Sequence, residues 1–456
     1  MNAPAFLQSR DRLLRLGAAV PRYTSYPTAP HFHDGVDEGT YRDWLGQVPE
    51  GTPISLYIHI PFCDRLCWFC GCHTKHTLKY EPVEAYLRVV EREIALVAAA
   101  IGKRVELREL HLGGGSPSLV KSRDLASIAD HLRAAFDITE QSRISVEIDP
   151  SDLDAGDCSG LEALGMNRAS IGVQDFDPVV QKAINRIQTF DDTARVAEAL
   201  RKAGAKSLNM DALYGLPHQN TQTMLKTLEQ VVSLRPDRIA MFGYAHVPWM
   251  KTHQRLIDEA SLPGIEERFE QANAAGDYLE AAGYRRIGID HFALPTDSLA
   301  IAAAEGRLRR NFQGYTDDPC EVLLGIGCSS IGRLPQGHIQ NITATGNYMA
   351  AVNKGDLPVA KGIAFTLDDR IRARVIEMIM CDFRIDTAAL EEEFGDAADK
   401  VIAQAEAICR QDRDGLLVKT GNDPVIPEPA RPFARSVAAR FDTYLETGKA
   451  RHSSGV

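Results

Sequence analysis

Short segments rich in apolar and β-branched residues alternate with segments of helical periodicity between residues 54 and 244. We expect strands at Ile54–Phe62, Glu109–Leu112, Arg143–Ile148, Ala169–Val173, Ser207–Leu213 and Arg238–Tyr244. The expected helices between them are Pro82–Ile101, Ser122–Phe136, Leu153–Leu164, Pro178–Asn185, Asp191–Ala203 and Thr221–Leu234. This alternation is typical of parallel strands joined by right-handed crossovers. It predicts an α/β fold, a partial (β/α)6 TIM-like barrel, with an open doubly wound sheet as the alternative.

The flanking regions have other patterns. Residues 1–50 are rich in proline, tyrosine and polar residues and sustain no helical or strand period, so we expect an arm over the active site. A surface linker is the alternative. Residues 51–362 then hold the barrel and a substrate-site extension, and residues 363–456 a mainly helical C-terminal domain. Its expected elements are helices Leu367–Met380, Asp386–Glu393, Val401–Asp412 and Arg431–Glu446, with a small hairpin after Asp414.

Composition limits the partners and the compartment. The chain of 456 residues has a formal net charge of −11 and no long run of Lys or Arg, which argues against nucleic acid as the main partner. The longest apolar runs fall well short of a membrane span. The first residues, Met1–Pro4, lack a basic segment followed by an apolar one. We therefore expect a cytoplasmic protein without a membrane partner. A monomer is a separate expectation that composition does not address.

Polar and glycine residues follow each expected strand. The segments are Cys63–Cys72, Gly113–Ser116, Glu147–Pro150, Gln174–Asp175, Asp211 with Gly215, and Tyr244–His246. In parallel α/β folds the chemistry gathers at the carboxyl ends of the strands. The sequence therefore predicts one active site at that end.

The strongest single motif is a group of cysteines. Cys63, Cys67 and Cys70 follow the spacing C-x3-C-x2-C, and thiolates are the usual ligands of iron–sulfur clusters. Three thiolates from one loop can hold three corners of a cubane and leave the fourth iron open. The alternatives are a buried helical stripe of cysteines, a structural zinc site with Cys72 as fourth ligand, and a four-thiolate electron-transfer cluster. Pro61 before the motif favours a loop over a helix.

Two further segments have chemistry of their own. The run Gly113–Ser116 follows an apolar strand, and glycine lets backbone approach a ligand closely. Glu147 lies among apolar residues at a strand end, where a carboxylate needs a partner. Ribose hydroxyls would be suitable donors, and a salt-bridged core glutamate is the alternative.

The cysteine motif, with Phe69 directly before the third cysteine, resembles the signature of the radical S-adenosylmethionine superfamily. More widely, the chain is similar to the oxygen-independent coproporphyrinogen III oxidases over nearly its whole length. The matching segments are Pro21–Thr28, Gly172–Phe176, Asn185–Arg186, Asn209–Asp211, Tyr244–His246, Gly288–Ala293, Arg310–Thr316 and Phe441–Leu445. The family usually has Thr where this chain has Ser116, and the hydroxyl is retained.

The resemblance implies cofactors and their residues. One 4Fe–4S cluster would bind to Cys63, Cys67 and Cys70, while Cys72 would not bind iron. Of two S-adenosylmethionine molecules, the one on the cluster would contact Tyr57, Gly114, Glu147 and Ile331. The second would contact Phe69, Gly115, Ser116, Gln174, Arg186, Asp211 and Ala245. His59 would be the catalytic proton donor, with a core histidine as the alternative.

The resemblance also implies a reaction. A 5′-deoxyadenosyl radical would abstract a β-hydrogen from a propionate of coproporphyrinogen III, and loss of carbon dioxide and one electron would leave a vinyl group. Two such anaerobic oxidative decarboxylations give protoporphyrinogen IX in haem and porphyrin biosynthesis. An electron donor for the cluster and an unidentified electron acceptor would be partners. The alternative is a haem chaperone on the same scaffold, a family that tends to lack the arm motif, the segment 311–315 and the fourth cysteine.

The four propionates of this substrate require cationic and hydrogen-bonding partners. Arginine suits carboxylates because its planar fork binds them in a bidentate manner. The cationic candidates are Arg22, Lys75, Arg186 and Arg310. Tyr23, Asn311 and Gln313 are the candidate neutral donors.

Overall fold

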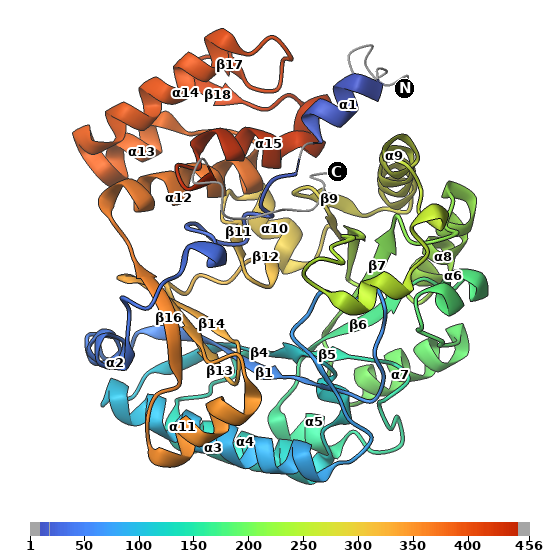
Figure 1. Ribbon diagram of the computed structural model, residues 1–456, viewed down its shortest axis with the longest axis vertical. Helices are drawn as coiled ribbons and strands as arrows, with labels where there is room; N and C mark the ends of the chain where they lie inside the picture. Colours follow the sequence, from blue (N-terminus) through green and yellow to red (C-terminus); the bar gives the residue numbers. More distant parts are fainter. Residues whose placement is uncertain (1–9, 18, 446–456) are drawn as a thin grey trace.

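A computed structural model describes residues 10–17 and 19–445, and a sheet of 12 strands forms its centre (Figure 1). Six strands run parallel in sequence order: β1 (Pro53–Ile60), β4 (Glu106–Gly114), β5 (Arg143–Ile148), β6 (Arg168–Gln174), β7 (Ser207–Tyr214) and β8 (Arg238–Gly243). Beyond β1 the sheet continues through β13 (Val322–Ile326), β14 (Ile331–Leu334), β15 (Gly337–Asn341) and β16 (Val359–Ala364). Beyond β8 it continues through β10 (His291–Ala293) and β9 (Arg285–Ile287).

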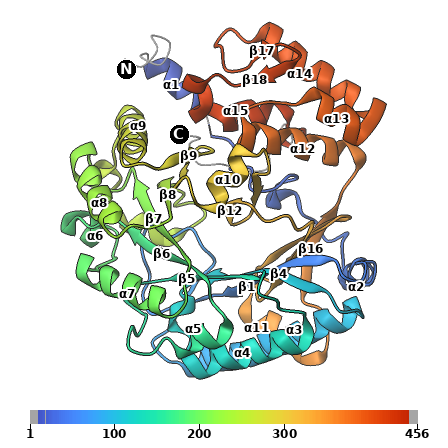
Figure 2. The same cartoon turned by 180° about the vertical axis from the view of Figure 1, so that it is seen from behind.

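The connecting helices lie on one side of this sheet. They are α3 (Glu81–Ile101), α4 (Ser122–Ala135), α5 (Ser159–Leu164), α6 (Pro178–Ala183), α7 (Phe190–Lys202), α8 (Thr221–Ser233) and α9 (Ile265–Ala281). Figures 1 and 2 show them around the convex outer face, while the inner face turns toward the centre of the molecule. A doubly wound sheet would have helices on both faces. The prediction of a partial barrel is therefore confirmed, and the sheet stays open between β16 and β9 in the described part of the chain.

Alternation along the strands separates the core from the barrel interior. In β5, Ile144, Val146 and Ile148 are buried against the helices, whereas Glu147 between them is only partly buried. Successive side chains of a strand point to opposite faces. The polar residues at the strand ends therefore face inward, which is the geometry that the predicted site requires.

Two expected helices differ from the structure. The helix expected at Leu153–Leu164 begins only at Ser159, because the preceding segment forms turns in which Asp154 and Asp157 accept backbone N–H groups. The expected final helix Arg431–Glu446 is wrong. Its place is taken by three short pieces, η7 (Glu428–Phe433), α15 (Ala434–Ala438) and η8 (Ala439–Phe441), and Glu446 lies outside the described residues. Pro432, which lacks an N–H, stands inside the first piece.

The arm is more ordered than its sequence pattern suggests. It contains α1 (Arg10–Leu16) and α2 (Glu38–Gly46), so the expectation of no helical period there is wrong. Asp37 caps α2 by accepting a hydrogen bond of 2.9 Å from the Thr40 backbone N–H. Tyr41 and Leu45 are buried at spacing i, i+4, which spans a single helical turn. One turn is too short for a helical periodicity to be recognised in the sequence.

The C-terminal helices pack as a separate cluster joined by the arm. The elements are α12 (Leu367–Asp382), α13 (Thr387–Phe394), α14 (Asp399–Gln411) and the hairpin of β17 (Val418–Thr420) and β18 (Asp423–Val425). Tyr23 and Tyr26 from the arm are buried in this cluster's core, so the arm links the barrel to it. The helical character is as expected, and the domain boundaries remain a prediction. No helix in the described ranges is both long and apolar enough to cross a membrane.

Replacing Tyr23 by phenylalanine should loosen this link. The Tyr23 hydroxyl donates a buried hydrogen bond of 3.0 Å to Asp442 Oδ2, and its loss should cost about 1–2 kcal/mol. A lower thermal midpoint and faster tryptic cleavage of the arm would report it. The matched control is Tyr278→Phe in α9, a tyrosine without a hydrogen-bond partner among the described residues. Equal shifts in the two variants would contradict the prediction.

Candidate active site

The three cysteines lie on a closed loop after β1. The short strands β2 (Phe62–Cys63) and β3 (Lys75–His76) pair in parallel and close the loop. Residues 64–74 contain no helix, which excludes the buried helical stripe of cysteines. Side chains from a single segment hold the loop by its carbonyls: Lys251 Nζ donates to Cys72, His253 Nε2 to Cys70 and Gln254 Nε2 to Phe69, at 2.8, 2.8 and 3.0 Å.

The loop has a donor set that fits an iron–sulfur cluster. Cys63, Cys67 and Cys70 are partly buried and carry free thiols. Arg186 Nη1 lies 3.7 Å from Cys67 Sγ, so a cation stands beside the sulfur that would become a thiolate. Hydrogen bonds from Cys72 lower the pKa of Cys70 to about 7, although burial opposes this shift. Burial raises the pKa of Cys67.

A cluster and a single zinc ion place different demands on the loop. Tetrahedral zinc requires four ligands around a single point, whereas each thiolate of a cubane binds its own iron. In the described part of the chain, no three His, Cys, Asp or Glu side chains converge so as to hold one metal ion. Metal analysis of the purified protein distinguishes the two.

A chain of polar contacts connects β1, β4 and β5 beside the loop. The Tyr57 hydroxyl lies 2.9 Å from His59 Nδ1, and the Tyr57 ring stacks on His111 at 5.8 Å between centroids. His111 Nε2 lies 3.0 Å from Glu147 Oε1. The Gly114 backbone N–H donates to Glu147 Oε2 at 3.0 Å. Four of the predicted site residues therefore lie together, joined by His111.

The carboxylate of Glu147 is held ionised. Burial raises its pKa, but the hydrogen bond and charge of His111 and the Gly114 N–H outweigh that effect, so the pKa lies below its ordinary value. Its side chain keeps 41% of its surface exposed because it faces the barrel interior. An ionised, accessible carboxylate with free lone pairs can accept hydroxyl groups of a ligand.

His59 is held in one tautomer. Its Nε2 lies 2.9 Å from the His73 carbonyl oxygen, which can only accept, so Nε2 carries the proton and Nδ1 accepts from the Tyr57 hydroxyl. Burial lowers the pKa of His59, which favours the neutral ring. The single N–H of His59 is thus already bonded to His73. Its role as proton donor remains a prediction.

Residues expected at the second cofactor are arranged around two aspartates. Ser116 Oγ donates to Asp152 Oδ2 at 2.7 Å, and Arg65 Nη2 forms an ion pair of 2.6 Å with the other oxygen of Asp152. Burial, then the charge of nearby Asp149, raises the pKa of Asp152 to about 7. Arg186 forms a buried ion pair of 2.8 Å with Asp149. These contacts bring Ser116 and Arg186 to the cysteine loop.

The other predicted residues follow along β6, β7 and β8. Asp211 accepts hydrogen bonds from Ser170 Oγ at 2.9 Å and Asn209 Nδ2 at 2.7 Å, and burial raises its pKa. Gln174 ends β6 with a φ of 64°, a left-handed conformation that is uncommon for a residue with a side chain. Ala245 lies just beyond β8, where its carbonyl accepts from Gln254 at 3.2 Å.

Of the seven candidate substrate residues, Lys75 and Arg186 lie at the cysteine loop, whereas the other five and Ile331 belong to other parts of the chain. Tyr23, Arg310 and Asn311 line a cavity of about 820 Å³ beside α12, within the size range of small-molecule sites. Asn311 Oδ1 also accepts from the backbone N–H of Gln313 at 2.9 Å, which shapes the turn between β11 (Arg309–Asn311) and β12 (Gly314–Thr316). Ile331 begins β14 and packs against Gly325, the neighbour of Tyr57 in the parallel pairing.

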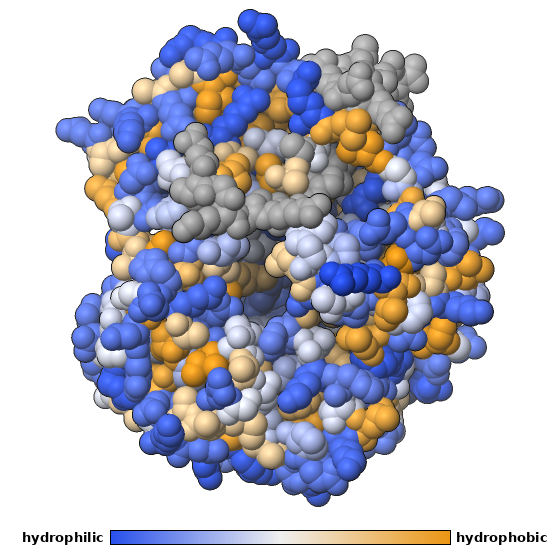
Figure 3. All heavy atoms as spheres, in the orientation of Figure 1, coloured by the Kyte–Doolittle hydropathy of each residue, from blue (hydrophilic) through white to orange (hydrophobic). Residues whose placement is uncertain are grey.

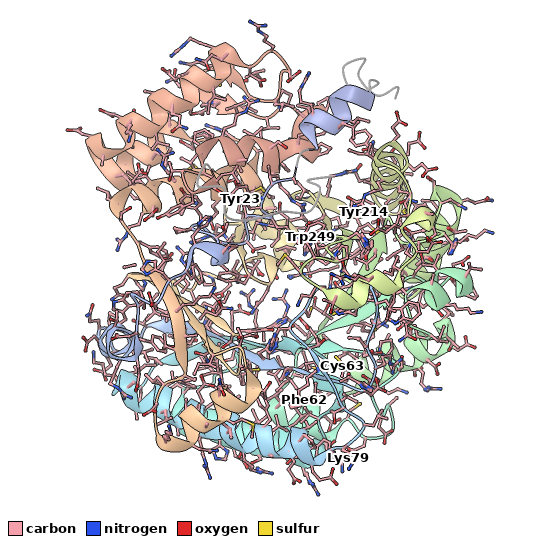
Figure 4. The ribbon with its side chains drawn as sticks, in the orientation of Figure 1. Tyr23, Phe62, Cys63, Lys79, Tyr214 and Trp249 are labelled. Atoms are coloured by element: carbon pink, nitrogen blue, oxygen red, sulfur yellow. The ribbon has the colours of Figure 1, made fainter. Side chains whose placement is uncertain are left out.

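A hollow opens at the centre of the face in Figure 3, between the barrel and the C-terminal helices. Figure 4 places Cys63 on the barrel side of the centre and Tyr23, from the arm, on the opposite side. Lys79 lies farther out from the centre than Cys63. The cysteine loop and the arm therefore face each other across the inner side of the sheet.

The site contains residues that sequence reasoning missed. His111 joins Tyr57 to Glu147, and the period of two along β4 could have indicated it, because it points to the same face as Gly113. Asp152 and Arg65 were not singled out either. They belong to a turn and a loop with no period, so only the fold brings them together.

Replacing Gly115 by alanine should displace the cysteine loop. A Cβ at Gly115 would lie 2.5 Å from the Phe62 carbonyl oxygen and 2.8 Å from that of Ile60, and both are backbone atoms. We expect a variant that loses most of its cluster iron, measured with acid-labile sulfide after reconstitution. Gly71→Ala in the same loop is the control, since its Cβ would meet nothing within 4 Å. Comparable iron content in the two variants would refute this.

The comparisons with known proteins agree with this geometry. Residues 57–231 match the Radical SAM superfamily. The oxygen-independent coproporphyrinogen III oxidase of Bradyrhizobium diazoefficiens is 46% identical over 437 residues, which cover 96% of this chain and 97% of that protein. Coproporphyrinogen III oxidase, anaerobic 1, of Cereibacter sphaeroides is 46% identical over 453 residues and 99% of each chain. The solved coproporphyrinogen III oxidase of Escherichia coli, described as a radical SAM enzyme, superposes with a TM-score of 0.88 at 36% identity, covering 93% of this chain and 97% of that one.

Proposed function

The chain belongs to the oxygen-independent coproporphyrinogen III oxidases of the radical SAM superfamily, and on that premise we propose that it catalyses the anaerobic oxidative decarboxylation of coproporphyrinogen III. Two propionate side chains become vinyl groups, and the product is protoporphyrinogen IX, an intermediate of haem and porphyrin biosynthesis. One observation carries the proposal. The His73 carbonyl, on the loop that carries the three thiols, binds His59, and the chain of contacts continues through Tyr57 and His111 to the ionised Glu147, so that a site for a cluster and a site for a polar cofactor adjoin.

The superfamily implies a 4Fe–4S cluster and S-adenosylmethionine. When bound, these groups supply a 5′-deoxyadenosyl radical that abstracts a hydrogen atom from the substrate. In our proposal Cys63, Cys67 and Cys70 hold the cluster. Glu147 accepts hydroxyl groups of the cofactor, and Gly114 and Tyr57 orient it. His59, neutral and bonded to His73, is placed to exchange a proton once that bond opens.

We further propose two S-adenosylmethionine molecules. The first contacts Tyr57, Gly114, Glu147 and Ile331. The second contacts the remaining set, namely Phe69, Gly115, Ser116, Gln174, Arg186, Asp211 and Ala245. In support, Ser116 and Arg186 reach the cysteine loop from other elements, and Asp211 stands close enough to Glu147 for their charges to interact.

The remaining proposals concern partners and surroundings. An electron donor reduces the cluster and a separate acceptor takes the electrons left by decarboxylation. All nine cysteines are unpaired, which suits a reducing compartment, and we place the enzyme in the cytoplasm as a monomer. We propose three units: the arm 1–50, the barrel 51–362 and the C-terminal domain 363–456. The arm closes over the site and excludes water from it.

The deciding experiment is anaerobic turnover. The cluster is reconstituted, then reductant, S-adenosylmethionine and coproporphyrinogen III are supplied, and protoporphyrin and 5′-deoxyadenosine are measured after oxidation of the products. Formation of both supports the proposal. Tight haem binding by a protein with an intact cluster that forms no protoporphyrin would instead assign the chain to the haem chaperones.

A further inference from the structure

Three guanidinium groups gather around one carboxylate where the arm, β10 and α15 meet. Arg435 Nη2 lies 3.4 Å from Asp290 Oδ2, a long ion pair. Arg310 Nη2 donates to the Arg22 carbonyl at 3.4 Å, and Arg22 Nη2 donates to the Gly243 carbonyl at the same distance. The residues come from positions 22, 290, 310 and 435 of the chain, so only the folded protein assembles this cluster.

The ion pairs of this cluster do not balance its positive charge, although the Arg310 guanidinium lies 4.4 Å from the Tyr315 ring centroid. Arg22 and Arg310 form no ion pair with any carboxylate in the described part of the chain, and Asp290 also binds His291 Nδ1 at 2.8 Å. With His291 counted as neutral, three cations face one anion. Three buried nitrogens, Nε and Nη1 of Arg310 and Nε of Arg435, have no hydrogen-bond partner among the described residues.

The pKa shifts differ between two of the arginines. Burial, and then repulsion from Arg435, lowers the pKa of Arg22 to about 10. Burial also acts to lower the pKa of Arg310, but Tyr315 and Asp290 outweigh it and raise this pKa. Removing charged groups from water without pairing them is costly. A guanidinium held in this way gains from an added anion, and a planar carboxylate matches its fork of donors.

A small cavity lies beside Arg22 and Arg435. These two arginines and Asp290 line a space of about 60 Å³ together with Gly243 and Ala245, and Arg268 and Arg286 also border it. One water needs roughly 10–15 Å³ by this measure, so the space takes a carboxylate and its neighbouring carbon but no pyrrole ring. Protein atoms crowd Arg22 enough to lower its pKa, yet part of its surface remains open to solvent, so the space can be reached. Arg310 does not line this space but borders the large cavity of about 820 Å³.

We propose that Arg22 and Arg435, with Arg310 bound to the Arg22 carbonyl beside them, form a carboxylate-binding site that holds one propionate of the tetrapyrrole substrate. This inference rests on the proposed function and names a contact within it. The cluster lies at the β8–β10 edge of the barrel, whereas the cysteine loop follows β1. The Gln254 amide links the two, because it donates to the Phe69 carbonyl of the loop and to the carbonyl of Ala245, which lines the small cavity. In this proposal, the propionate held by the arginines positions the ring so that another propionate reaches the cysteine loop.

Coproporphyrin III, the stable oxidised form of the ring system, is a suitable probe because it keeps all four carboxylates and fluoresces. Arg435→Gln in the reconstituted enzyme should weaken its binding about ten- to hundredfold, as expected for one charge-assisted contact. Asp290→Asn should leave the affinity for coproporphyrin III unchanged or raise it, because this substitution removes the negative charge that opposes the three arginines. A purely structural Arg435–Asp290 pair predicts instead that both variants weaken binding equally, which would overturn the proposal.

Matched controls separate charge at this site from general effects. Arg431→Gln removes an exposed arginine one turn earlier, whose guanidinium lies 4.8 Å from the Phe383 ring centroid, and should not change affinity. Arg435→Lys keeps the positive charge but lacks the planar guanidinium that binds a carboxylate in a bidentate manner, so it should lose part of the affinity. This variant still tests the site if Arg435→Gln fails to fold. The tetramethyl ester of the probe should bind the wild type weakly and be insensitive to Arg435→Gln.

The carboxylate could also come from the methionine part of S-adenosylmethionine, since Ala245 borders the cavity. Equilibrium dialysis with S-adenosylmethionine distinguishes the two sources: selective loss of its binding in Arg435→Gln, with probe affinity intact, would overturn the propionate assignment. Wild-type enzyme that forms no protoporphyrin would refute the proposed function itself. Wild-type turnover combined with unchanged probe affinity in Arg435→Gln and Arg435→Lys would refute this site alone.

Discussion

Cys67→Ala should abolish formation of both protoporphyrin and 5′-deoxyadenosine. Only two of the three predicted cluster ligands, Cys63 and Cys70, would remain, too few to hold three corners of a cubane, and the Arg186 guanidinium would lose the sulfur that lies 3.7 Å from it. We expect iron and acid-labile sulfide to fall to a small fraction of the wild-type content after reconstitution. The brown colour and its broad visible absorbance should disappear together with activity.

Cys72→Ala is the matched control for this loss. Cys72 lies on the same loop and is exposed, and its backbone N–H is 3.4 Å from Cys70 Sγ, yet we do not expect it to bind iron. This variant should keep its cluster. Loss of iron equal to that of Cys67→Ala would instead indicate a four-thiolate cluster. Zinc in place of iron in the wild-type protein would contradict both readings.

Most of the barrel could be predicted because its strands and helices are encoded by patterns of neighbouring residues. Strand β5 was expected at Arg143–Ile148 and has these bounds, since Ile144, Val146 and Ile148 alternate with polar residues over its whole length. The strand ends then placed Glu147 and Gly114 on one edge without any knowledge of contacts. Periodicity of two and the rule for parallel sheets were sufficient for that step.

Parts that depend on tertiary contacts could not be predicted. Helix α2 is stabilised by one cap and one buried turn, which leave a pattern too short to detect. The arginine cluster needs Arg22 and Arg435, 413 positions apart, to meet at Asp290. Similarly, the hydroxyl of Tyr23, expected to bind substrate, donates to Asp442. The spacing of residues along the sequence does not predict such long-range contacts.

The second large effect is expected from Glu147→Gln. The carboxylate accepts the Gly114 N–H through one oxygen and bonds His111 Nε2 through the other, at 3.0 Å each. A glutamine has one acceptor oxygen and an amide NH2, so one of these two N–H donors would face another donor. The pKa of Glu147 lies below its ordinary value, so the wild type presents a full negative charge at neutral pH, which the variant lacks.

We therefore expect affinity for S-adenosylmethionine to fall about 10- to 100-fold in Glu147→Gln, corresponding to about 1.5–3 kcal/mol for a hydrogen bond to a charged group. Cluster iron should stay at the wild-type level, because Glu147 is not one of the predicted cluster ligands. Equilibrium dialysis under anaerobic conditions measures the affinity, and iron analysis of the same samples measures the cluster. Turnover should fall with affinity at limiting cofactor.

Glu106→Gln is the control for this variant. Glu106 begins β4 and pairs with Arg108 at 2.9 Å on a partly exposed surface, where such a pair contributes at most about 1 kcal/mol to stability. It should leave cofactor affinity unchanged. If Glu147→Gln lowers the thermal midpoint but keeps cofactor affinity, Glu147 is a salt-bridged core residue that only orients His111. The carboxylate then plays no part in binding, and the cofactor must be held by the backbone of the glycine turn.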